Sequence, residues 1–386
     1  MYNIKTLNNI SKVGLNNFPK DKYKISNDTK SPDAILVRSA KMHEYDFETS
    51  LLAIGRAGAG VNNIPVSKCA ENGIVVFNTP GANANAVKEL VLASLFLSSR
   101  RICEAIGWVK TLKGNENVAT LCEKGKAQFA GPEILGKTLG VIGLGAIGVK
   151  VCNSVDSLGM NVIGFDPFLS LENAFHLSQN IKLADDLDEL IKNSDYISLH
   201  LPCTDDTKNM IDKECIGKMK DGVRIINLAR NELVNNADLL KALDCKKVAK
   251  YITDFASEDL IDKENVIVFP HIGASTPESE DNCAINVSIE IMDYLENGNI
   301  INSVNLPSAI LPRSGKPRIC VIHKNISNMI SSITSVMSQS GCNIDNMINK
   351  SRGDFAYSIF DIDCEPPKNL QTDISSIEGV IRVRII

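Results

Sequence analysis

Short apolar runs alternate with amphipathic segments along most of the chain. From residue 34 to residue 78 the runs are AILV, LLAIG and GIVVF, each followed by polar or glycine-rich residues. From residue 137 onwards the alternation continues through TLGVIG, NVIGF, YISLHL, VRIINL, KYITDF and VIVF. Buried strands that alternate with helices are typical of parallel sheets with helices packed on both faces. The pattern therefore predicts two α/β units, a smaller one and a doubly wound one.

Helical periodicity predicts two long helices, and the end of the chain forms a pattern of its own. Apolar residues at three- and four-residue spacing indicate one continuous helix over residues 86–109 and another over residues 276–297. The stretch LPRSGKP, which contains proline, glycine and basic residues, is typical of a linker. Residues 316–386 then show the order strand, helix, strand, strand, short helix, strand. This β-α-β-β-α-β order predicts a ferredoxin-like domain.

Composition and charge narrow the class of protein. Apolar residues make up 44% of the 386 residues and charged residues 23%, which is ordinary for a soluble globular protein. A net charge of -5 does not favour binding to nucleic acid or to an anionic membrane, and no apolar run has the length of a bilayer span. The N-terminal stretch has no apolar core of signal-peptide length. We therefore expect a cytoplasmic protein.

The eleven cysteines show no C-x-x-C spacing, so neither a metal site nor a redox motif is expected. Several lie in apolar or helical stretches, among them Cys103, Cys152, Cys283 and Cys320. An odd count also argues against a fully paired set of disulfides. We expect buried, reduced thiols.

A glycine-rich turn follows the first apolar run of the larger unit. In VIGLGAIG, Gly143, Gly145 and Gly148 have G-x-G-x-x-G spacing between an expected strand and an expected helix, the context that this motif requires. The first glycine permits a tight turn, the second lets the backbone approach a pyrophosphate, and the third allows close packing of the helix. The N–H groups at the start of the helix, at Ala146 and Ile147, would then face the phosphates. The motif predicts a dinucleotide site.

Asp166 ends the next apolar run, eighteen residues after Gly148. A carboxylate there can accept hydrogen bonds from the ribose hydroxyls and would repel a 2′-phosphate, and no arginine or lysine follows nearby. NAD is therefore expected rather than NADP. The alternative is that Asp166 is only a turn residue before Pro167.

Several further stretches carry a resemblance to a known family: VRSAKMHE, AIGRAGAGVNNI, GKTLGVIGLGAIG, FDPF, SLHLP, INLARNELV and FPHIGAST. From about residue 37 to the end, the chain resembles the D-isomer-specific 2-hydroxyacid dehydrogenases, and most closely those that act on phosphoglycerate. The resemblance implies hydride transfer between NAD and a small 2-hydroxy acid. It also assigns Pro202, Thr207, Ala229 and Asp254 to the cofactor site.

The resemblance implies three catalytic residues. His271 in PHIGAST matches the base that takes the hydroxyl proton, and its near-neutral pKa suits proton transfer in both directions. Arg230 in INLARNELV matches the arginine that binds the substrate carboxylate. In the family, the carboxylate that orients the base follows shortly after an Asp that matches Asp254. It matches Glu258 if this chain lacks one residue of the family's stretch after Asp254, and Asp259 if the family's spacing is kept. Glu258 is the preferred assignment because of its longer side chain.

Two expected strand ends in the first domain supply positive charge for a substrate. VRSAK contains Arg38, Ser39 and Lys41, and AIGRAGAG contains Arg56, Ala57 and Gly58. Backbone N–H groups of such a glycine turn can bind a carboxylate, while basic side chains can bind a phosphate. The cluster favours a phosphorylated substrate, 3-phosphoglycerate, although each charge alone is more often a solvated one.

The C-terminal unit resembles an ACT domain, an amino-acid-binding regulatory module. His323, Asn325 and Asn343 match the serine-binding positions of phosphoglycerate dehydrogenases. L-serine is thus one expected effector. The alternative is that the unit binds nothing and only mediates contacts in a homo-oligomer, a dimer or a tetramer.

Together these points predict a discontinuous substrate-binding domain over residues 1–87 and 276–308. An NAD-binding Rossmann domain is expected over residues 88–275, followed by the ACT domain over residues 316–386. The expected reaction is NAD-dependent oxidation of 3-phospho-D-glycerate. Two alternatives stay open: another 2-hydroxy acid such as glyoxylate or 2-hydroxyglutarate, or a non-catalytic NAD-sensing regulator on the same scaffold.

Overall fold

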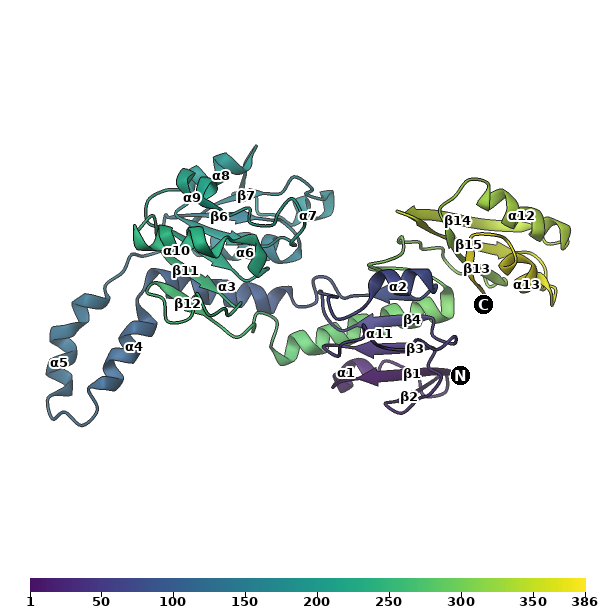
Figure 1. Cartoon of the computed structure of the whole chain (residues 1–386), viewed down its shortest axis with the longest axis horizontal. Coiled ribbons are helices and arrows are strands. Elements are labelled where there is room, and N and C mark those ends of the chain that lie inside the picture. The colour runs from purple at the N-terminus through teal and green to yellow at the C-terminus, as the bar shows by residue number, and fades with distance from the viewer. The chain divides into compact units, whose positions relative to one another are not determined.

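The chain forms two units in the computed structural model, which describes residues 1–386 (Figure 1). One unit comprises Met1–Asn83 together with Pro277–Ile386, and the other comprises Ala84–Thr276. We refer to them as the outer unit and the central unit, after their positions along the chain. Each has its own parallel sheet, as the alternation of strands and helices predicts.

The central unit is built on a seven-stranded parallel sheet in the order β12-β11-β10-β9-β6-β7-β8. Counted from β6, this is the doubly wound order in which the strand sequence reverses between β6 and β9. Apolar side chains from β6, β9 and β10 are almost fully buried between layers of helices. The strands are β6 Thr138–Ile142, β7 Asn161–Phe165, β8 Lys182–Leu183, β9 Tyr196–Leu199, β10 Val223–Asn227, β11 Val248–Thr253 and β12 Val266–Val268.

Helices cover both faces of this sheet, and a hairpin of two more helices stands apart from it (Figure 1). The packed helices are α3 Ala84–Ser99, α6 Ala146–Ser157, α7 Leu171–His176, α8 Leu187–Asn193, α9 Lys213–Lys218 and α10 Asn236–Asp244. The hairpin consists of α4 Ile102–Thr111 and α5 Val118–Gly125, followed by the 3-10 turn η1 Lys126–Phe129. Neither α4 nor α5 contains a buried residue.

The expectation of one continuous helix over residues 86–109 is wrong, because the chain breaks between α3 and α4. Ser98 and Ser99 donate their hydroxyls back to the carbonyl oxygen of Leu95, at 2.8 and 2.9 Å. Arg101 leaves helical geometry with φ −74° and ψ 52°. Serine side chains that compete for backbone carbonyls weaken a helix, and the apolar spacing continues through the break, so periodicity alone hides it.

The outer unit begins with a five-stranded parallel sheet in the order β2-β1-β3-β4-β5. The first two strands were not predicted, because their apolar runs are short. One long helix from the far end of the sequence, α11, packs against β4 and β5 and completes the core. The elements are β1 Tyr2–Leu7, α1 Lys12–Leu15, β2 Tyr23–Ser26, β3 Ala34–Val37, β4 Ala53–Arg56, α2 Val66–Glu71, β5 Val75–Phe77 and α11 Pro277–Asn297.

The end of the chain forms an antiparallel four-stranded sheet in the order β14-β15-β13-β16. Two helices complete the β-α-β-β-α-β order, so the predicted ferredoxin-like topology is confirmed. We call residues 316–386 the C-terminal domain. Its elements are β13 Arg318–Lys324, α12 Met329–Gln339, β14 Ile344–Arg352, β15 Phe355–Ile362, α13 Leu370–Ser375 and β16 Val380–Ile385.

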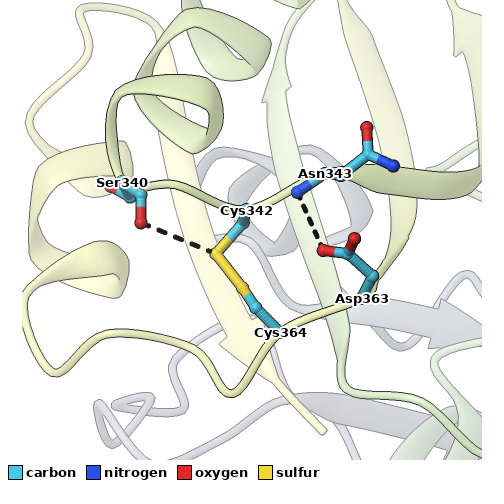
Figure 2. The surroundings of a disulfide bond; sticks show 5 residues. All are labelled: Ser340, Cys342, Asn343, Asp363 and Cys364. Carbon is cyan, nitrogen blue, oxygen red and sulfur yellow. Dashed lines mark hydrogen bonds between the residues drawn. A yellow bond between two sulfur atoms is a disulfide. The ribbon is translucent and has the colours of Figure 1, made fainter.

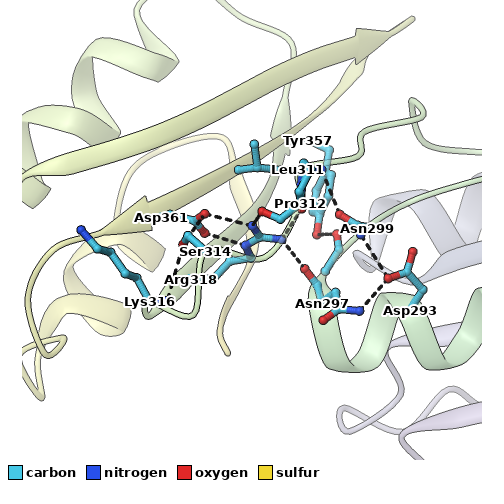
Figure 3. Close-up of polar contacts among 11 residues, drawn as sticks. Asp293, Asn297, Asn299, Leu311, Pro312, Ser314, Lys316, Arg318, Tyr357 and Asp361 are labelled. Carbon is cyan, nitrogen blue, oxygen red and sulfur yellow. Dashed lines mark hydrogen bonds and ion pairs between the residues drawn. The ribbon is translucent and has the colours of Figure 1, made fainter.

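The C-terminal domain is joined to the end of α11 by a fully buried arginine (Figure 3). Arg318 pairs with Asp361, Nε to Oδ1 at 2.6 Å, and neither side chain is exposed. Its remaining N–H groups donate to the carbonyl oxygens of Asn297, Leu311 and Pro312 at 2.8–2.9 Å. A buried ion pair needs all its donors and acceptors satisfied, and these carbonyls supply that satisfaction. The guanidinium therefore fixes the linker and the helix end to β13.

The cysteines differ from the expectation in two respects. Cys342 and Cys364 form a disulfide that connects the start of β14 with the loop after β15 (Figure 2). Nearby, the backbone N–H of Asn343 donates to Asp363 at 3.0 Å. Cys103 is exposed, whereas Cys152 is buried as predicted. The hairpin of β14 and β15 brings the bonded pair together across 22 positions, a proximity that cysteine spacing does not reveal.

Long helices occur in the structure, but none has the apolar length that a bilayer crossing needs.

Candidate active site

The glycine turn of the central unit lies between β6 and α6. Gly143 has φ +94°, and a Cβ there would come within 2.5 Å of the carbonyl oxygen of His200. A Cβ on Gly148 would lie 2.0 Å from the carbonyl oxygen of Gly143. Both positions therefore require glycine.

The first turn of α6 is open to an anion. Gly145 precedes the helix and supplies no side-chain cap, and a Cβ there would meet no atom within 4 Å. The N–H groups at Ala146, Ile147 and Gly148 begin the helix, where the positive end of the helix dipole lies. This cradle has the form that a pyrophosphate needs.

Asp166 follows β7 and lies against the same turn. Its Oδ2 accepts the N–H of Leu144 at 2.8 Å, and its Oδ1 accepts the N–H of Phe168 at 2.9 Å. The carboxylate is thus fixed beside the glycine turn, and each oxygen keeps further lone pairs for other donors. Its role in cofactor selection stays a prediction.

The loop after β9 is closed by a threonine. Thr207 donates its hydroxyl to the carbonyl oxygen of Pro202 at 2.8 Å and accepts the N–H of Thr204 at 2.8 Å. At the start of this loop, His200 contacts Ser198 through Nε2 at 2.8 Å. Burial lowers the pKa of His200 to about 3, so its ring is neutral at physiological pH.

Arg230 lies just beyond β10, in a turn organised by a residue that sequence reasoning missed. Asn227 is fully buried, and its side-chain oxygen accepts the N–H groups of Ala229 and Arg230 at 3.2 and 3.3 Å. Its side-chain nitrogen donates to the carbonyl oxygen of Arg230 at 2.8 Å. The guanidinium also donates to the carbonyl oxygen of Ala229 at 2.6 Å. An Asn that ends an apolar strand is the signal that could have found it.

Asp254 and His271 lie together at the ends of β11 and β12. The backbone N–H of His271 donates to the carbonyl oxygen of Asp254 at 2.8 Å. The ring of His271 lies 4.9 Å from that of Phe255, centroid to centroid. His271 has φ +38°, a backbone conformation that non-glycine residues rarely adopt and that recurs at functional sites. The imidazole itself is exposed.

The carboxyl group of Asp254 is buried and only partly hydrogen-bonded. It is 1% exposed, Oδ2 accepts the N–H of Gly273 at 3.0 Å, and Oδ1 has no hydrogen-bond partner. Burial raises its pKa, while the Gly273 hydrogen bond and the charges of His271 and Arg230 oppose that rise. Asp254 therefore lies buried at the end of β11, between the strands β10 and β12 that precede the predicted arginine and the predicted base.

Neither predicted orienting carboxylate is hydrogen-bonded to His271. Glu258 is exposed. Asp259 is bonded instead to Ser257 and Asn236, and the Ser257 hydrogen bond is the main cause that lowers its pKa. The choice between Glu258 and Asp259 stays open.

The predicted substrate residues of the outer unit follow β3 and β4, which are neighbours in the sheet. Arg38 Nη1 pairs with Glu280 Oε1 of α11 at 2.6 Å, and Arg56 Nε donates to the carbonyl oxygen of Arg38 at 3.1 Å. The N–H of Ala57 donates to Val37 at 2.8 Å. Gly58 has φ +140° and lies directly under the Arg56 guanidinium. We call residues 56–59 the substrate loop.

Asn8, a supporting residue that the sequence did not indicate, follows β1. Its side-chain oxygen accepts the N–H groups of Ser39 and Ala40 at 3.1 and 2.6 Å. Lys41 is exposed beyond this turn. The turn after β3 is thus tied to the end of β1.

The predicted effector residues are not gathered in one place. His323 is 2% exposed, and both ring nitrogens are occupied, Nδ1 by the Lys324 carbonyl at 2.8 Å and Nε2 by Ser358 at 2.9 Å. Asn325 donates to the carbonyl oxygen of Gly353 at 3.0 Å. Strands β13 and β14 run in the same direction, since both pair antiparallel with β15. Asn343 precedes β14, so it lies at the opposite end of the sheet from His323.

Comparison with known proteins identifies the family of the chain. Residues 92–273 match the sequence model of the D-isomer specific 2-hydroxyacid dehydrogenase NAD-binding domain. A D-3-phosphoglycerate dehydrogenase of Escherichia coli (strain K12) is 32% identical over 350 residues, which cover 87% of this chain and 82% of that protein. The chain belongs to the D-isomer-specific 2-hydroxyacid dehydrogenase family.

Other members of this dehydrogenase family extend the comparison. A D-3-phosphoglycerate dehydrogenase of Bacillus subtilis (strain 168) is 36% identical over 285 residues, or 72% of this chain. The match covers 52% of that protein, so the chain spans about half the length of this relative. An NAD+-bound 3-phosphoglycerate dehydrogenase structure from Entamoeba histolytica superposes with a TM-score of 0.61 at 27% identity, covering 79% of this chain and 98% of that one. The predicted α/β fold and the NAD-binding domain are thereby confirmed.

Proposed function

We propose that this dehydrogenase oxidises 3-phospho-D-glycerate to 3-phosphohydroxypyruvate with NAD. The observation that carries the proposal is that Arg230, Asp254 and His271 follow the neighbouring parallel strands β10, β11 and β12, with the backbone N–H of His271 on the carbonyl oxygen of Asp254 at 2.8 Å. The substrate follows from the named relatives and from the basic residues Arg38 and Arg56, which a phosphate group would complement.

The residues of the central unit fit NAD. The uncapped start of α6 and the open space at Gly145 suit a pyrophosphate, and the Asp166 carboxylate lies beside the same turn. Within this site Pro202, Thr207 and Ala229 belong to the strand-end loops that would surround the cofactor. When bound, NAD accepts a hydride from the carbon that carries the substrate hydroxyl group.

The chain's own residues supply the rest of the chemistry. The guanidinium of Arg230 would bind the substrate carboxylate through paired N–H donors and keep the hydroxyl-bearing carbon in place. The imidazole of His271 would take the hydroxyl proton on a ring nitrogen, while the oxygen's electron pair forms the carbonyl bond. The predicted orienting carboxylate, Glu258 or Asp259, would stabilise the imidazolium ion formed in that step, and Asp254 would lie near the cofactor.

One assay tests the proposal. NADH production is followed with 3-phosphoglycerate beside D-lactate, D-glycerate and 2-hydroxyglutarate at equal concentrations. We expect the highest kcat/KM with 3-phosphoglycerate. If another acid gave the highest kcat/KM, that acid would be assigned as the substrate and the proposed chemistry would stand. Binding of NADH without turnover of any acid would contradict the catalytic role and favour a regulator.

We further propose a homo-oligomer that L-serine regulates through the C-terminal domain. Strand β14 is a largely exposed edge strand, which can pair with a second copy. Antiparallel pairing of two copies would bring opposite ends of their sheets side by side, and with them the separated positions His323 and Asn343. Light scattering with and without L-serine, together with inhibition of NADH production, tests this proposal. A monomer insensitive to serine would overturn it.

The proposed reaction also favours the cytoplasm, where both NAD and phosphorylated acids occur. Nine unpaired cysteines agree with a reducing compartment. The Cys342–Cys364 disulfide is the observation against it.

A further inference from the structure

Helix α11 buries a carboxylic acid that the proposed mechanism does not use. Glu290 is 7% exposed. Its Oε1 accepts the side-chain N–H of Asn302 at 2.7 Å, whereas Oε2 is buried without a hydrogen-bond partner. No basic side chain forms an ion pair with it. Such a group is costly to bury, so its burial calls for a role that compensates the cost.

Asn302 connects this acid to the end of β5. Its φ of +56° is a conformation that favours glycine, and the Glu290 hydrogen bond holds the side chain there. Its carbonyl oxygen accepts the N–H of Asn78 at 3.3 Å. Beyond it, the N–H of Val304 donates to Val76 at 2.9 Å, so residues 302–305 run beside β5.

Asn78 carries the connection to the substrate loop. Its side-chain nitrogen donates to the carbonyl oxygen of Ala59 at 2.6 Å. The N–H of the next residue, Thr79, donates to the carbonyl oxygen of Gly58 at 3.1 Å. A continuous series of hydrogen bonds therefore runs from Glu290 through Asn302 and Asn78 to the loop that contains Arg56.

The C-terminal domain reaches the same segment. Arg352, at the end of β14, donates to the carbonyl oxygen of Ser303 at 2.8 Å. The turn that follows it is held by Asn325, whose backbone N–H donates to Asp354 at 2.8 Å and whose side chain donates to Gly353 at 3.0 Å. Asn325, a predicted effector residue, thus supports the turn beside Arg352, and Arg352 contacts the segment that supports the substrate loop.

We propose that Glu290 and Asn302 are positioning residues that set the geometry of the substrate loop, and that Arg352 connects the C-terminal domain to the same network. The proposal rests on the proposed function, because that function assigns residues 56–59 to the substrate. Neither Glu290 nor Asn302 contacts the reacting atoms. They act through Asn78, which fixes the carbonyl groups of the loop and thereby the direction of its N–H groups.

The first experiment compares Glu290→Ala with Glu290→Gln. We expect E290A to raise the KM for 3-phosphoglycerate about two- to tenfold, the effect of one lost hydrogen bond, with kcat within about twofold of wild type. E290Q retains an oxygen that accepts from Asn302, so its KM should match wild type. Glu296→Ala is the control, since Glu296 lies on the same helix but bonds Tyr23 and Lys22 instead. Equal effects of E290A and E290Q, or of E290A and E296A, would overturn the proposal.

The second experiment needs no turnover. Hydrogen–deuterium exchange reports the N–H groups of Asn78 and Thr79 directly in peptides covering residues 77–82. We expect faster exchange there in E290A, a smaller increase in Arg352→Ala, and none in Lys350→Ala, which changes an exposed residue two positions earlier on the same face of β14. Peptides of the central unit should not change.

The two readouts separate two kinds of failure. Absence of wild-type turnover with 3-phosphoglycerate would remove the proposed function, while the exchange data would still test the network. Unchanged exchange at residues 77–82 in E290A would overturn the positioning role even in an active enzyme. Unchanged exchange in R352A would overturn the connection to the C-terminal domain.

Discussion

The loops at the carboxyl ends of the two parallel sheets are supported in different ways. In the central unit Asn227 supports Arg230 across three positions of sequence, and Asp254 accepts from Gly273 across nineteen. In the outer unit Asn305 supports β5 across 229 positions, and Arg38, after β3, pairs with Glu280 of α11 at 2.6 Å. Support for the predicted chemistry is thus local in the central unit, whereas the outer unit takes part of its support from the end of the chain.

This difference predicts which property a substitution in each unit should alter. Substitutions in the central unit should alter chemistry with little effect on folding elsewhere. Substitutions near the end of the chain should alter the stability and the geometry of the outer unit. The following predictions test that division, from the largest expected effect to the smallest.

Replacement of His271 by alanine should have the largest effect on activity. Loss of a general base costs about 10²- to 10⁴-fold in kcat, while the glycine turn and Asp166 remain intact. Turnover with 3-phosphoglycerate and the fluorescence of bound NADH measure the two properties separately. Weak NADH binding in H271A would contradict the assigned role, because the ring would then support the cofactor site.

Replacement of Arg318 by alanine should destabilise the outer unit by about 3–5 kcal/mol, since it leaves Asp361 buried without its partner. Calorimetry should show the unfolding transition of the outer unit at lower temperature and that of the central unit unchanged. Arg313→Ala, at an exposed position in the same linker, is the control. If both unfolding transitions shifted to the same extent, the two units would not be stabilised independently, and the comparison between them would fail.

Glu290 should make the stability of the outer unit depend on pH. Burial raises its pKa from 4.5 to about 8, so the folded chain keeps a proton that the unfolded chain has already lost. The free energy of unfolding should therefore fall by an amount on the order of 4 kcal/mol as the pH rises from about 5 to about 8, and then level off. Urea titrations of wild type and E290Q across this range measure the difference. If the free energies of unfolding of wild type and E290Q changed with pH in the same way, the raised pKa of Glu290 would be contradicted.

Replacement of Asp166 by asparagine should have a smaller effect, confined to cofactor choice. Loss of the negative charge should reduce discrimination against NADP about tenfold, which corresponds to roughly 1.4 kcal/mol. The ratio of kcat/KM for NAD and NADP measures it, with Asp185→Asn at an exposed position as the control. An unchanged ratio would show that selection lies elsewhere.

The sequence predicted most of what local patterns encode. Strands and the glycine turn follow from short motifs whose residues are close along the chain, whereas the roles of Arg230, Asp254 and His271 rest on the resemblance and stay predictions. The supporting residues Asn8, Asn78 and Glu290 could not be predicted, because their partners are set by the tertiary fold. The break between α3 and α4 was missed for a related reason: serine hydroxyls, and not apolar spacing, end that helix. The pairing of Cys342 with Cys364 likewise depends on a hairpin that spacing does not show.

The hairpin of α4 and α5 has a thermodynamic consequence of its own. It buries no residue within its chain, and Ile102, Ile106 and Val109 remain exposed. Ile102 and Val109 line, together with Trp108, a cavity of about 430 Å³. Apolar area left in water adds nothing to the folding free energy of one copy. If a second copy covers it, folding and association become one equilibrium, and the melting temperature rises with protein concentration.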